Sequence, residues 1–345
     1  MTIKNVLVTG AGGYIGTTLV PRLLESGFKV AALDRFFFGN KLPHSDSNLV
    51  CIKEDSRKVE RKHLENIDAV IDLVAISNDP SGEAFEKATW EINYESRART
   101  AHIAKEAGVR RYLLPSSCSI YGFQETIADE SSRTNPLTVY AKANEAAEKA
   151  VLNLQDEKFI VTVIRQATIF GYSPRMRFDL AINGMTYGAY KNKKLPLMRD
   201  GSQYRPMLHV QDTADAMVLM LTADQDRVNG QIFNVGSEKN TYQLGDIGKI
   251  IAETVGNHIN KTIPIEWYGD ADHRSYQVSF KKIQDQLGWH TCLSAKDGCL
   301  EIIKKLELGL LDKTDETITL DWYLKLEKWR KIIKETEMHG GILDI

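Results

Sequence analysis

The chain has 345 residues, of which 43% are hydrophobic and 26% are charged, and its formal net charge is −2 at pH 7. This length accommodates one large domain or two closely packed ones with a sizeable buried core. The near-neutral charge gives no general attraction to nucleic acid or anionic membrane, so local groups are expected to hold any anionic ligand.

The first half of the chain alternates short apolar runs with helical patterns. Strands are predicted at NVLVTG, KVAALD, LVCIKED, AVIDLVA, RRYLLPSS and FIVTVIR, and helices at TTLVPRLLESG, 84–107 and 138–154. Strands that alternate with helices form parallel sheets. Because these strands lack period-2 alternation, both faces of the sheet are expected to be buried. The pattern therefore predicts an α/β fold with a doubly wound parallel sheet.

After residue 165 this alternation weakens. The stretch TLDWYLKLEKWRKIIKE is the exception, because it predicts a strongly amphipathic helix. Such a helix is expected to pack on its own domain or on a dimer partner. Its apolar stripe consists of Leu320, Tyr323, Leu326, Trp329 and Ile333.

A glycine-rich stretch, VTGAGGYIG, joins the first predicted strand to the first predicted helix. Gly10 permits a tight turn, Gly13 lets the backbone approach a pyrophosphate, and Gly16 lets helix and strand pack closely. Asp34 ends the second predicted strand, where a carboxylate accepts hydrogen bonds from ribose hydroxyls and repels a 2′-phosphate. The adjacent Arg35 points the other way, since arginine can hold that phosphate. On balance the pattern predicts a dinucleotide site that prefers NAD to NADP.

The GxxGxxG spacing, and the segments that follow it in order, resemble the extended short-chain dehydrogenase/reductases, specifically the NAD-dependent nucleotide-sugar epimerase/dehydratase family. KEDSRK, DLVAISNDP and WEINYESRART are similar to the family segments along the cofactor. SSCSIYG, YAKAN, VIRQATIFG, RPMLHVQD and ADHRSYQVSFKKIQDQLGW are similar to its active-site and substrate segments. The resemblance implies NAD as cofactor and a nucleotide-diphospho-sugar as substrate. The implied cofactor-binding residues are Gly10, Gly13, Tyr14, Ile15, Gly16, Asp34, Arg35, Asp55, Ser56, Val74, Ala75, Asn93 and Tyr140.

The resemblance also implies how the chain is divided. Residues 1–170 and 207–237 would form the NAD-binding Rossmann domain. Residues 171–206 and 238–345 would form a smaller α/β lobe for the nucleotide sugar, which includes the C-terminal helix. The cleft between them, at the carboxyl ends of the strands, is the expected substrate site.

By position, Tyr140 and Ser117 match the family's catalytic tyrosine and serine. In that family a tyrosine phenolate takes the proton of the substrate hydroxyl, and the serine hydroxyl bonds the same oxygen. A free tyrosine titrates near pH ~10, so its pKa must be lowered for it to act as a base near neutrality. The family uses a lysine one helical turn later, and here that position is Asn144. Asparagine can still bond the nicotinamide ribose, but it carries no charge.

Three interpretations of Asn144 remain open. In the first, oxidised NAD is the main activator of Tyr140; in the second, another cation (Lys142, Arg177 or Arg205) supplies the missing charge. Alternatively the protein has lost its chemistry and serves as an NAD-binding module.

The residues after Ser117 discriminate among reactions. Family members that eliminate water carry an Asp–Glu pair there, whereas this chain has Cys118 and Ser119, neither of which protonates a leaving hydroxyl as a carboxylic acid does. Cys118 is interpreted as a small buried filler. The resemblance then implies oxidation of a ring carbon, C4, by a 4-epimerase or 4-dehydrogenase that makes activated sugars for surface polysaccharides. A sugar-nucleotide 4,6-dehydratase is the less favoured enzyme.

The diphosphate of a sugar nucleotide requires cationic or amide donors, and arginine supplies two of them in a fixed geometry. Arg274 matches the family arginine that contacts this group, and Thr168 stands where many relatives have asparagine. The expected substrate-binding residues are Ser117, Cys118, Ser119, Thr168, Arg175, Arg177, Arg205 and Arg274.

The four cysteines include no CxxC pair and no neighbouring histidine cluster, so neither a disulfide framework nor a metal site is expected. No apolar stretch reaches the length of a membrane span, and no signal-peptide pattern precedes the first strand. We therefore predict a soluble, cytoplasmic protein. The resemblance adds a homodimer in which helices 84–107 and 138–154 pair across a two-fold axis.

Overall fold

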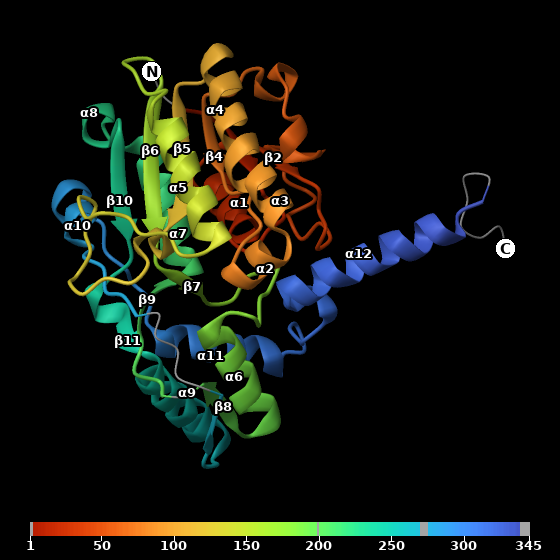
Figure 1. Ribbon diagram of the computed structural model, residues 1–345, viewed down its shortest axis with the longest axis vertical. Coiled ribbons are helices and arrows are strands. Elements are labelled where there is room, and N and C mark those ends of the chain that lie inside the picture. The colour runs from red at the N-terminus through yellow and green to blue at the C-terminus, as the bar shows by residue number, and fades with distance from the viewer. Residues whose placement is uncertain (1–2, 199, 270–274, 339–345) are drawn as a thin grey trace.

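The computed structural model describes residues 3–198, 200–269 and 275–338. A seven-stranded parallel sheet with the order β10-β6-β5-β4-β1-β2-β3 forms its centre (Figure 1). The direction of winding reverses between β1 and β4, as in a doubly wound sheet, so the fold class predicted from the sequence is confirmed. The strands are β1 (Asn5–Thr9), β2 (Lys29–Asp34), β3 (Leu49–Lys53), β4 (Ala69–Asp72), β5 (Arg111–Ser117), β6 (Ile160–Gln166) and β10 (Gln231–Val235).

Helices cover both faces of this sheet (Figure 1). In β1, Val6 and Val8 belong to the core beneath one helical layer and Leu7 to the core beneath the other, and all three are fully buried. Both faces therefore need apolar side chains, which is why the strands lack alternation. One layer contains α1 (Gly16–Glu25) and α7 (Val210–Thr222), and the other contains α4 (Arg97–Glu106) and α5 (Val139–Leu152).

The edge strand β3 departs from this pattern. Its Val50 is 61% exposed, because β3 pairs only with β2 in the sheet order. The expectation that every strand is buried on both faces is wrong for this one.

The helix predicted over residues 84–107 is divided in the structure. It consists of α2 (Asp79–Ala84), α3 (Glu86–Trp90), a π-helical turn (Glu91–Ser96) and α4. Phe85, with φ −128°, separates α2 from α3. π-Helical turns are frequent at functional sites, and this one contains Asn93 and directly precedes Arg97, two inward-facing residues four positions apart. Asn93 is fully buried, and Arg97 is 1% exposed.

A smaller lobe packs below the carboxyl ends of the central strands (Figure 1). Its sheets have the orders β11-β9-β7 and β12-β8. Its own core contains Ile182, Leu195, Ile247 and Ile303. The strands are β7 (Thr168–Phe170), β8 (Leu195–Met198), β9 (Tyr204–His209), β11 (Thr241–Gln243) and β12 (Ile265–Tyr268), and the helices are α6 (Ala181–Asn192), α9 (Leu244–Ile259) and α11 (Ala295–Glu307). Two short helices, α8 (Gln225–Val228) and α10 (Lys281–Leu287), adjoin β10.

The amphipathic helix predicted near the end of the sequence is α12 (Thr319–Thr336). Its first half contacts the body, and its second half projects away from it (Figure 1). The apolar stripe divides accordingly, because Tyr323 packs against aromatic rings of the body whereas Trp329 is 41% exposed. Within the described ranges, none of the helices combines the length and the apolar character needed to cross a membrane.

Candidate active site

A cavity of about 1110 Å³ lies at the carboxyl ends of the central strands. The glycine-rich loop lines one part of it, Ser117 and Tyr140 line another, and Arg205 and Tyr276 reach it from the smaller lobe. Ligand pockets commonly measure about 300–1,000 Å³. This cavity therefore has room for a dinucleotide and a second molecule beside it.

At Gly10 and Gly16 of the glycine-rich loop there is no space for a side chain. Gly10 has φ +67°, and a Cβ added to it would lie 2.7 Å from the backbone nitrogen of Val74. A Cβ on Gly16 would lie 2.5 Å from the carbonyl oxygen of Ala11. Because α1 begins at Gly16, the positive end of its dipole faces the loop, as an anion-binding helix end requires. Gly13, Tyr14 and Ile15 also line the cavity.

Asp34 lies at the end of β2, where it lines the cavity. Its two carboxylate oxygens accept hydrogen bonds from the backbone N–H of Gly12 (3.0 Å) and of Phe36 (2.5 Å). Burial raises the pKa of Asp34, and these N–H groups together with Arg175 and Arg35 oppose the rise. Each oxygen retains a lone pair, so this carboxylate fits the hydroxyls of a ribose.

Asp55 pairs with Arg35, the residue that the sequence analysis considered as a possible partner of the 2′-phosphate of NADP. The Arg35 guanidinium lies 3.0 Å from the Asp55 carboxylate, which also binds Arg57 at 2.8 Å. Hydrogen bonding to Arg57 holds the pKa of Asp55 below its usual range. Ser56 lies beside Asp55 in the cavity lining. Arg35 is thus already paired, and the glycine loop, Asp34 and this segment together fit NAD.

The loop after β4 forms the wall of the cavity next to the glycine loop, with Val74 and Ala75 in the lining. Asn93 does not line the cavity. Its side-chain amide instead accepts a hydrogen bond from Ile76 N (2.8 Å) and donates one to Ile76 O (3.0 Å). Asn93 therefore positions the loop from behind, rather than contacting a ligand itself.

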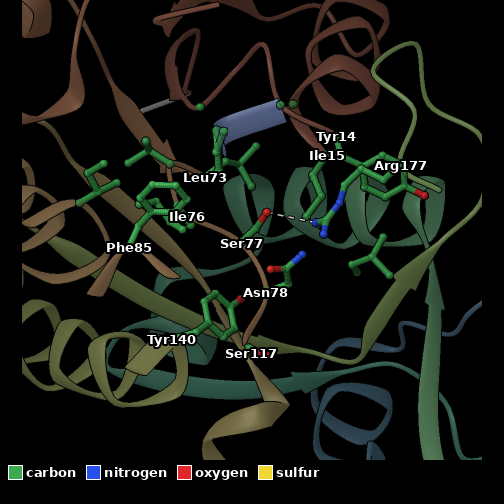
Figure 2. A pocket seen from close by; sticks show the side chains of 18 of the residues that line it. Tyr14, Ile15, Leu73, Ile76, Ser77, Asn78, Phe85, Ser117, Tyr140 and Arg177 are labelled. Carbon is green, nitrogen blue, oxygen red and sulfur yellow. Dashed lines mark hydrogen bonds between the residues drawn. The ribbon is translucent and has the colours of Figure 1, made fainter. Parts of the chain in front are cut away.

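Tyr140 and Ser117 meet at the other side of the cavity (Figure 2). Ser117 ends β5, and Tyr140 stands in the first turn of α5, whose N-terminus is capped by the Thr138 side chain. A Cβ on Gly82 of α2 would lie 3.1 Å from the Tyr140 Cβ, so α2 packs closely against the tyrosine. This packing fixes the position of the phenol.

Burial raises the pKa of Tyr140 above its ordinary value. The charge of Arg97 and hydrogen bonds from the side chains of Ser117 and Asn144 lower it, while Asp79 raises it further. Asn144 itself is 1% exposed and lies behind the tyrosine, outside the cavity lining. Its Nδ2 donates to the Tyr140 carbonyl at 3.1 Å. The structure thus leaves a phenol whose strongest nearby cation is Arg97, a residue that sequence reasoning did not single out.

Cys118 and Ser119 have different positions. Cys118 is fully buried away from the cavity, and its thiol donates to the Arg165 carbonyl at 3.2 Å. Burial raises the pKa of this thiol well above its ordinary value, which agrees with a packing residue rather than a reactive one. Ser119 lines the cavity, and its buried hydroxyl has no hydrogen-bond partner within the described part of the chain.

The arginines expected to bind substrate lie at separate places. Arg175 lies beside the glycine loop, where its backbone N–H donates to the Thr17 hydroxyl (3.3 Å) and its guanidinium stacks on the Phe38 ring at 3.6 Å. Burial lowers its pKa to about 10. No ion pair is found for Arg175 among the residues that the structure describes, and its Nε has no hydrogen-bond partner there. Its Nη2 donates to the Thr319 hydroxyl at 3.0 Å, and the residue lines the cavity on the side of the glycine loop.

Arg177 forms an ion pair with Asp179 at 2.6 Å and donates to the Ser77 hydroxyl at 3.1 Å, as the dashed line in Figure 2 shows. Arg205 lies over the Tyr276 ring at 5.4 Å, on the side of the smaller lobe. Thr168 lines the cavity and hydrogen-bonds the Tyr276 hydroxyl. Arg274 lies outside the described residues.

Sequence reasoning missed several residues of the cavity lining. Asn78 has φ +99°, an uncommon value for a residue with a side chain, and its amide donates to Asp179 at 2.9 Å. Tyr276 and Tyr323 also line the cavity. Asn78 and Tyr276 lie within segments that resemble the family, but their roles depend on contacts across the fold that no local pattern contains.

Comparison with known proteins identifies the family of this chain. The model of the "NAD dependent epimerase/dehydratase family" matches residues 6–236. A trifunctional UDP-glucose 4,6-dehydratase/UDP-4-keto-6-deoxy-D-glucose 3,5-epimerase/UDP-4-keto-L-rhamnose-reductase of Arabidopsis thaliana is 24% identical over 94% of this chain, which spans 48% of that protein. The dTDP-D-glucose 4,6-dehydratase of Mus musculus is 26% identical over 97% of this chain and 93% of its own length.

Among solved structures, MoeE5 in complex with UDP-glucuronic acid and NAD superposes with a TM-score of 0.77 at 25% identity, over 88% of this chain and 99% of that chain. The family match covers more than half of the sequence and includes the glycine loop, Ser117 and Tyr140. It confirms the family and the cofactor predicted from the sequence. The chain belongs to the NAD-dependent epimerase/dehydratase family.

Proposed function

We propose that the protein oxidises a ring carbon, C4, of a nucleotide-diphospho-sugar, as a 4-epimerase or a 4-dehydrogenase of activated-sugar biosynthesis. The observation that carries this proposal is the shared cavity. The Ser117–Tyr140 pair and the glycine-rich loop open into the same space, which is large enough for two ligands. Oxidation of an alcohol needs this combination of a base and a hydride acceptor.

The residues divide the chemistry between them. The Tyr140 phenolate accepts the proton of the C4 hydroxyl, and the Ser117 hydroxyl donates a hydrogen bond to the same oxygen. When bound, oxidised NAD accepts the hydride that leaves C4. A 4-dehydrogenase would release the resulting ketone. In a 4-epimerase, Tyr140 would return its proton to the oxygen after the opposite face of C4 had taken back the hydride.

A nucleotide sugar as substrate is supported by charge and by relationship. Arg205 brings a guanidinium to the cavity from the smaller lobe, and Arg177, which is paired with Asp179, brings a second one beside Tyr14 (Figure 2). The names of these relatives refer to UDP- or dTDP-sugars. Arg274 remains the proposed partner of the diphosphate on the strength of the resemblance alone.

Two other functions have an observation in their favour. Both curated relatives named above include 4,6-dehydratase in their names, but water elimination needs an acid that Cys118 and Ser119 do not provide. A non-catalytic NAD-binding module is favoured by Asn144, which stands where the family has lysine. The observations do not favour it over an enzyme, because Tyr140 and Ser117 are both present in the cavity.

The test is incubation of the NAD-loaded protein with a panel of UDP- and dTDP-hexoses and hexuronic acids, followed by chromatography and mass spectrometry of the products. We expect an epimer of unchanged mass, or a ketone two hydrogens lighter. Loss of water would identify a dehydratase instead. If every sugar is returned unchanged while the cofactor stays bound, the binding module becomes the better description. The Tyr140→Phe variant is the matched control.

A further inference from the structure

A buried arginine lies behind the active-site tyrosine. Arg97 opens α4 directly after the π-helical turn and is 1% exposed. One of its terminal nitrogens donates to the carbonyl of Asp72, the last residue of β4 (2.8 Å), and to that of Pro115 within β5 (2.5 Å). The other donates to Asn144 Oδ1 at 2.9 Å. The guanidinium is therefore fixed between the central sheet and α5.

This contact fixes the orientation of the Asn144 amide. A guanidinium has only donors, so the Asn144 atom that it contacts must be the oxygen. The amide nitrogen must then point the other way, toward Tyr140, where it donates to the backbone carbonyl at 3.1 Å and favours the ionised phenol, which lowers the pKa of Tyr140. The positive end of an oriented amide thus faces the tyrosine, and a positive charge stands directly behind it.

The ion pairing of Arg97 does not by itself explain why the residue is buried there. The Asp72 carboxylate is 4.0 Å from Arg97 Nε, a long separation for an ion pair, and it already accepts hydrogen bonds from the hydroxyls of Thr9 and Tyr112. Buried pairs of this kind are weak evidence for a stabilising role. The contact to Asn144 is the one that links the buried guanidinium to the neighbouring active site.

We propose that Arg97 and Asn144 together replace the lysine of the family: Arg97 supplies the positive charge, and Asn144 presents an oriented N–H that conveys it to Tyr140. In this arrangement Arg97 is a positioning residue that acts through Asn144, and the tyrosine is the catalytic base. The inference rests on the proposed function for its biological meaning, but the arrangement itself is a property of the folded chain.

The other charged groups around Tyr140 do not fill this role. On α2, Asp79 raises the pKa of Tyr140, and Glu83 binds the backbone N–H of Val139. On the far side of Asn144, Glu148 and Arg165 form an ion pair at 2.8 Å and largely cancel each other. Among the influences that lower the pKa of Tyr140, the charge of Arg97 is the largest.

The cations named from the sequence are engaged elsewhere. Lys142 is exposed and outside the cavity lining. Arg177 is paired with Asp179, and Arg205 lies over Tyr276. Arg97 was not considered because 47 residues separate it from Asn144.

Direct titration of Tyr140 tests the proposal without any turnover. The full-length NAD-bound protein is labelled with ¹³Cζ-tyrosine, the Tyr140 resonance is assigned by its loss in Tyr140→Phe, and its chemical shift is followed against pH. Arg97→Met and Asn144→Leu should each raise the pKa of Tyr140 by roughly one unit, because each removes a favourable interaction with the phenolate. Arg97→Lys should keep the wild-type titration. The double variant Arg97→Met/Asn144→Lys should restore it.

An unchanged titration in Arg97→Met overturns the proposal. If that variant does not fold, Asn144→Leu takes its place, and an unchanged titration there has the same meaning. The result is independent of the proposed function. If no nucleotide sugar reacts and Arg97→Met still raises the pKa of Tyr140, the proposed function is wrong and the proposed role of Arg97 and Asn144 stands. If sugars are oxidised and the pKa of Tyr140 is unchanged in Arg97→Met, the proposed function stands and the proposed role of Arg97 and Asn144 is wrong.

Discussion

Tyr140 is held between α2 and the end of β5, and its immediate neighbours are a serine hydroxyl and an asparagine amide rather than a lysine. Burial favours the neutral phenol, whereas Arg97 favours the phenolate, and the balance leaves the pKa raised. A base with a raised pKa is deprotonated only as the pH increases. At the scale of single residues, the structure thus predicts a rate of oxidation that increases with pH through the alkaline range.

Removing the phenol should abolish oxidation while cofactor binding is kept. Tyr140→Phe loses the base and should lower kcat by about a hundredfold to ten-thousandfold. Ser117→Ala removes one hydrogen bond to a developing anion, about 1.5–3 kcal/mol, and should lower kcat by about tenfold to a hundredfold. Steady-state kinetics with the best substrate of the panel checks both. Equal losses in the two variants would mean that Tyr140 only positions the substrate.

Arg175 is proposed to face the phosphates of the cofactor, although the sequence suggested the substrate. Its buried guanidinium stacks on Phe38 beside the glycine loop. Arg175→Met keeps most of the packing and removes the charge, so the Kd for NAD should rise about tenfold or more. The Kd for the nucleotide sugar should not change. Arg205→Met is the matched control, in which the Kd for the nucleotide sugar should rise and the Kd for NAD should not change. Calorimetric titration measures both dissociation constants. A weaker sugar complex in Arg175→Met would support the assignment made from the sequence.

At the scale of elements, α12 adds a wall to the cofactor cavity. Tyr323 packs on Phe38 and Phe85 with ring centroids 5.7 and 6.0 Å apart. The indole of Trp322 donates to the Phe37 carbonyl at 2.8 Å. The helix thus fastens the loop that follows β2, beside Asp34.

The two halves of α12 provide a matched pair of variants. Tyr323→Ala should lower the free energy of unfolding by about 2 kcal/mol and weaken NAD binding, because it removes aromatic packing at the cavity wall. Ile333→Ala, in the projecting half, where the side chain is 38% exposed, should change neither in the monomer. Chemical denaturation and NAD titration of both variants check this. Equal effects would show that the cofactor cavity gains nothing specific from the first half of the helix.

Features that adjacent residues determine could be predicted from the sequence, whereas features that depend on contacts across the fold could not. The glycine-rich loop, Asp34 and the strand ends were predictable, since a turn or a strand end is encoded by adjacent residues. The break at Phe85 and the π-helical turn were not, because the apolar pattern over 84–107 is the same for a continuous helix. Arg97 was missed because its meaning depends on Asn144 and on two carbonyls of the sheet.

At the scale of the whole molecule, the doubly wound sheet brings the ends of β1, β2, β4, β5 and β6 to one edge, and the smaller lobe closes over that edge (Figure 1). The site is therefore assembled from distant segments that the sheet order brings together. The division of the chain at residues 170, 207 and 237 stays a proposal, as does the cytoplasmic location.

Dimerisation through the segments 84–107 and 138–154 also stays a prediction. In the structure, α4 and α5 lie beside each other on one face of the sheet (Figure 1), so both could meet a second copy. Sedimentation equilibrium should give about twice the chain mass of 38.9 kDa. A monomer at micromolar concentration would contradict the prediction.

The most direct test of the central claim is stopped-flow absorbance of the nicotinamide after the NAD⁺-loaded protein is mixed with each nucleotide sugar. We predict that at least one sugar reduces the bound cofactor, transiently for an epimerase or lastingly for a dehydrogenase. The rate should increase with pH and disappear in Tyr140→Phe. Cofactor that stays oxidised with every sugar at every pH, in a protein shown to bind both ligands, would contradict the account.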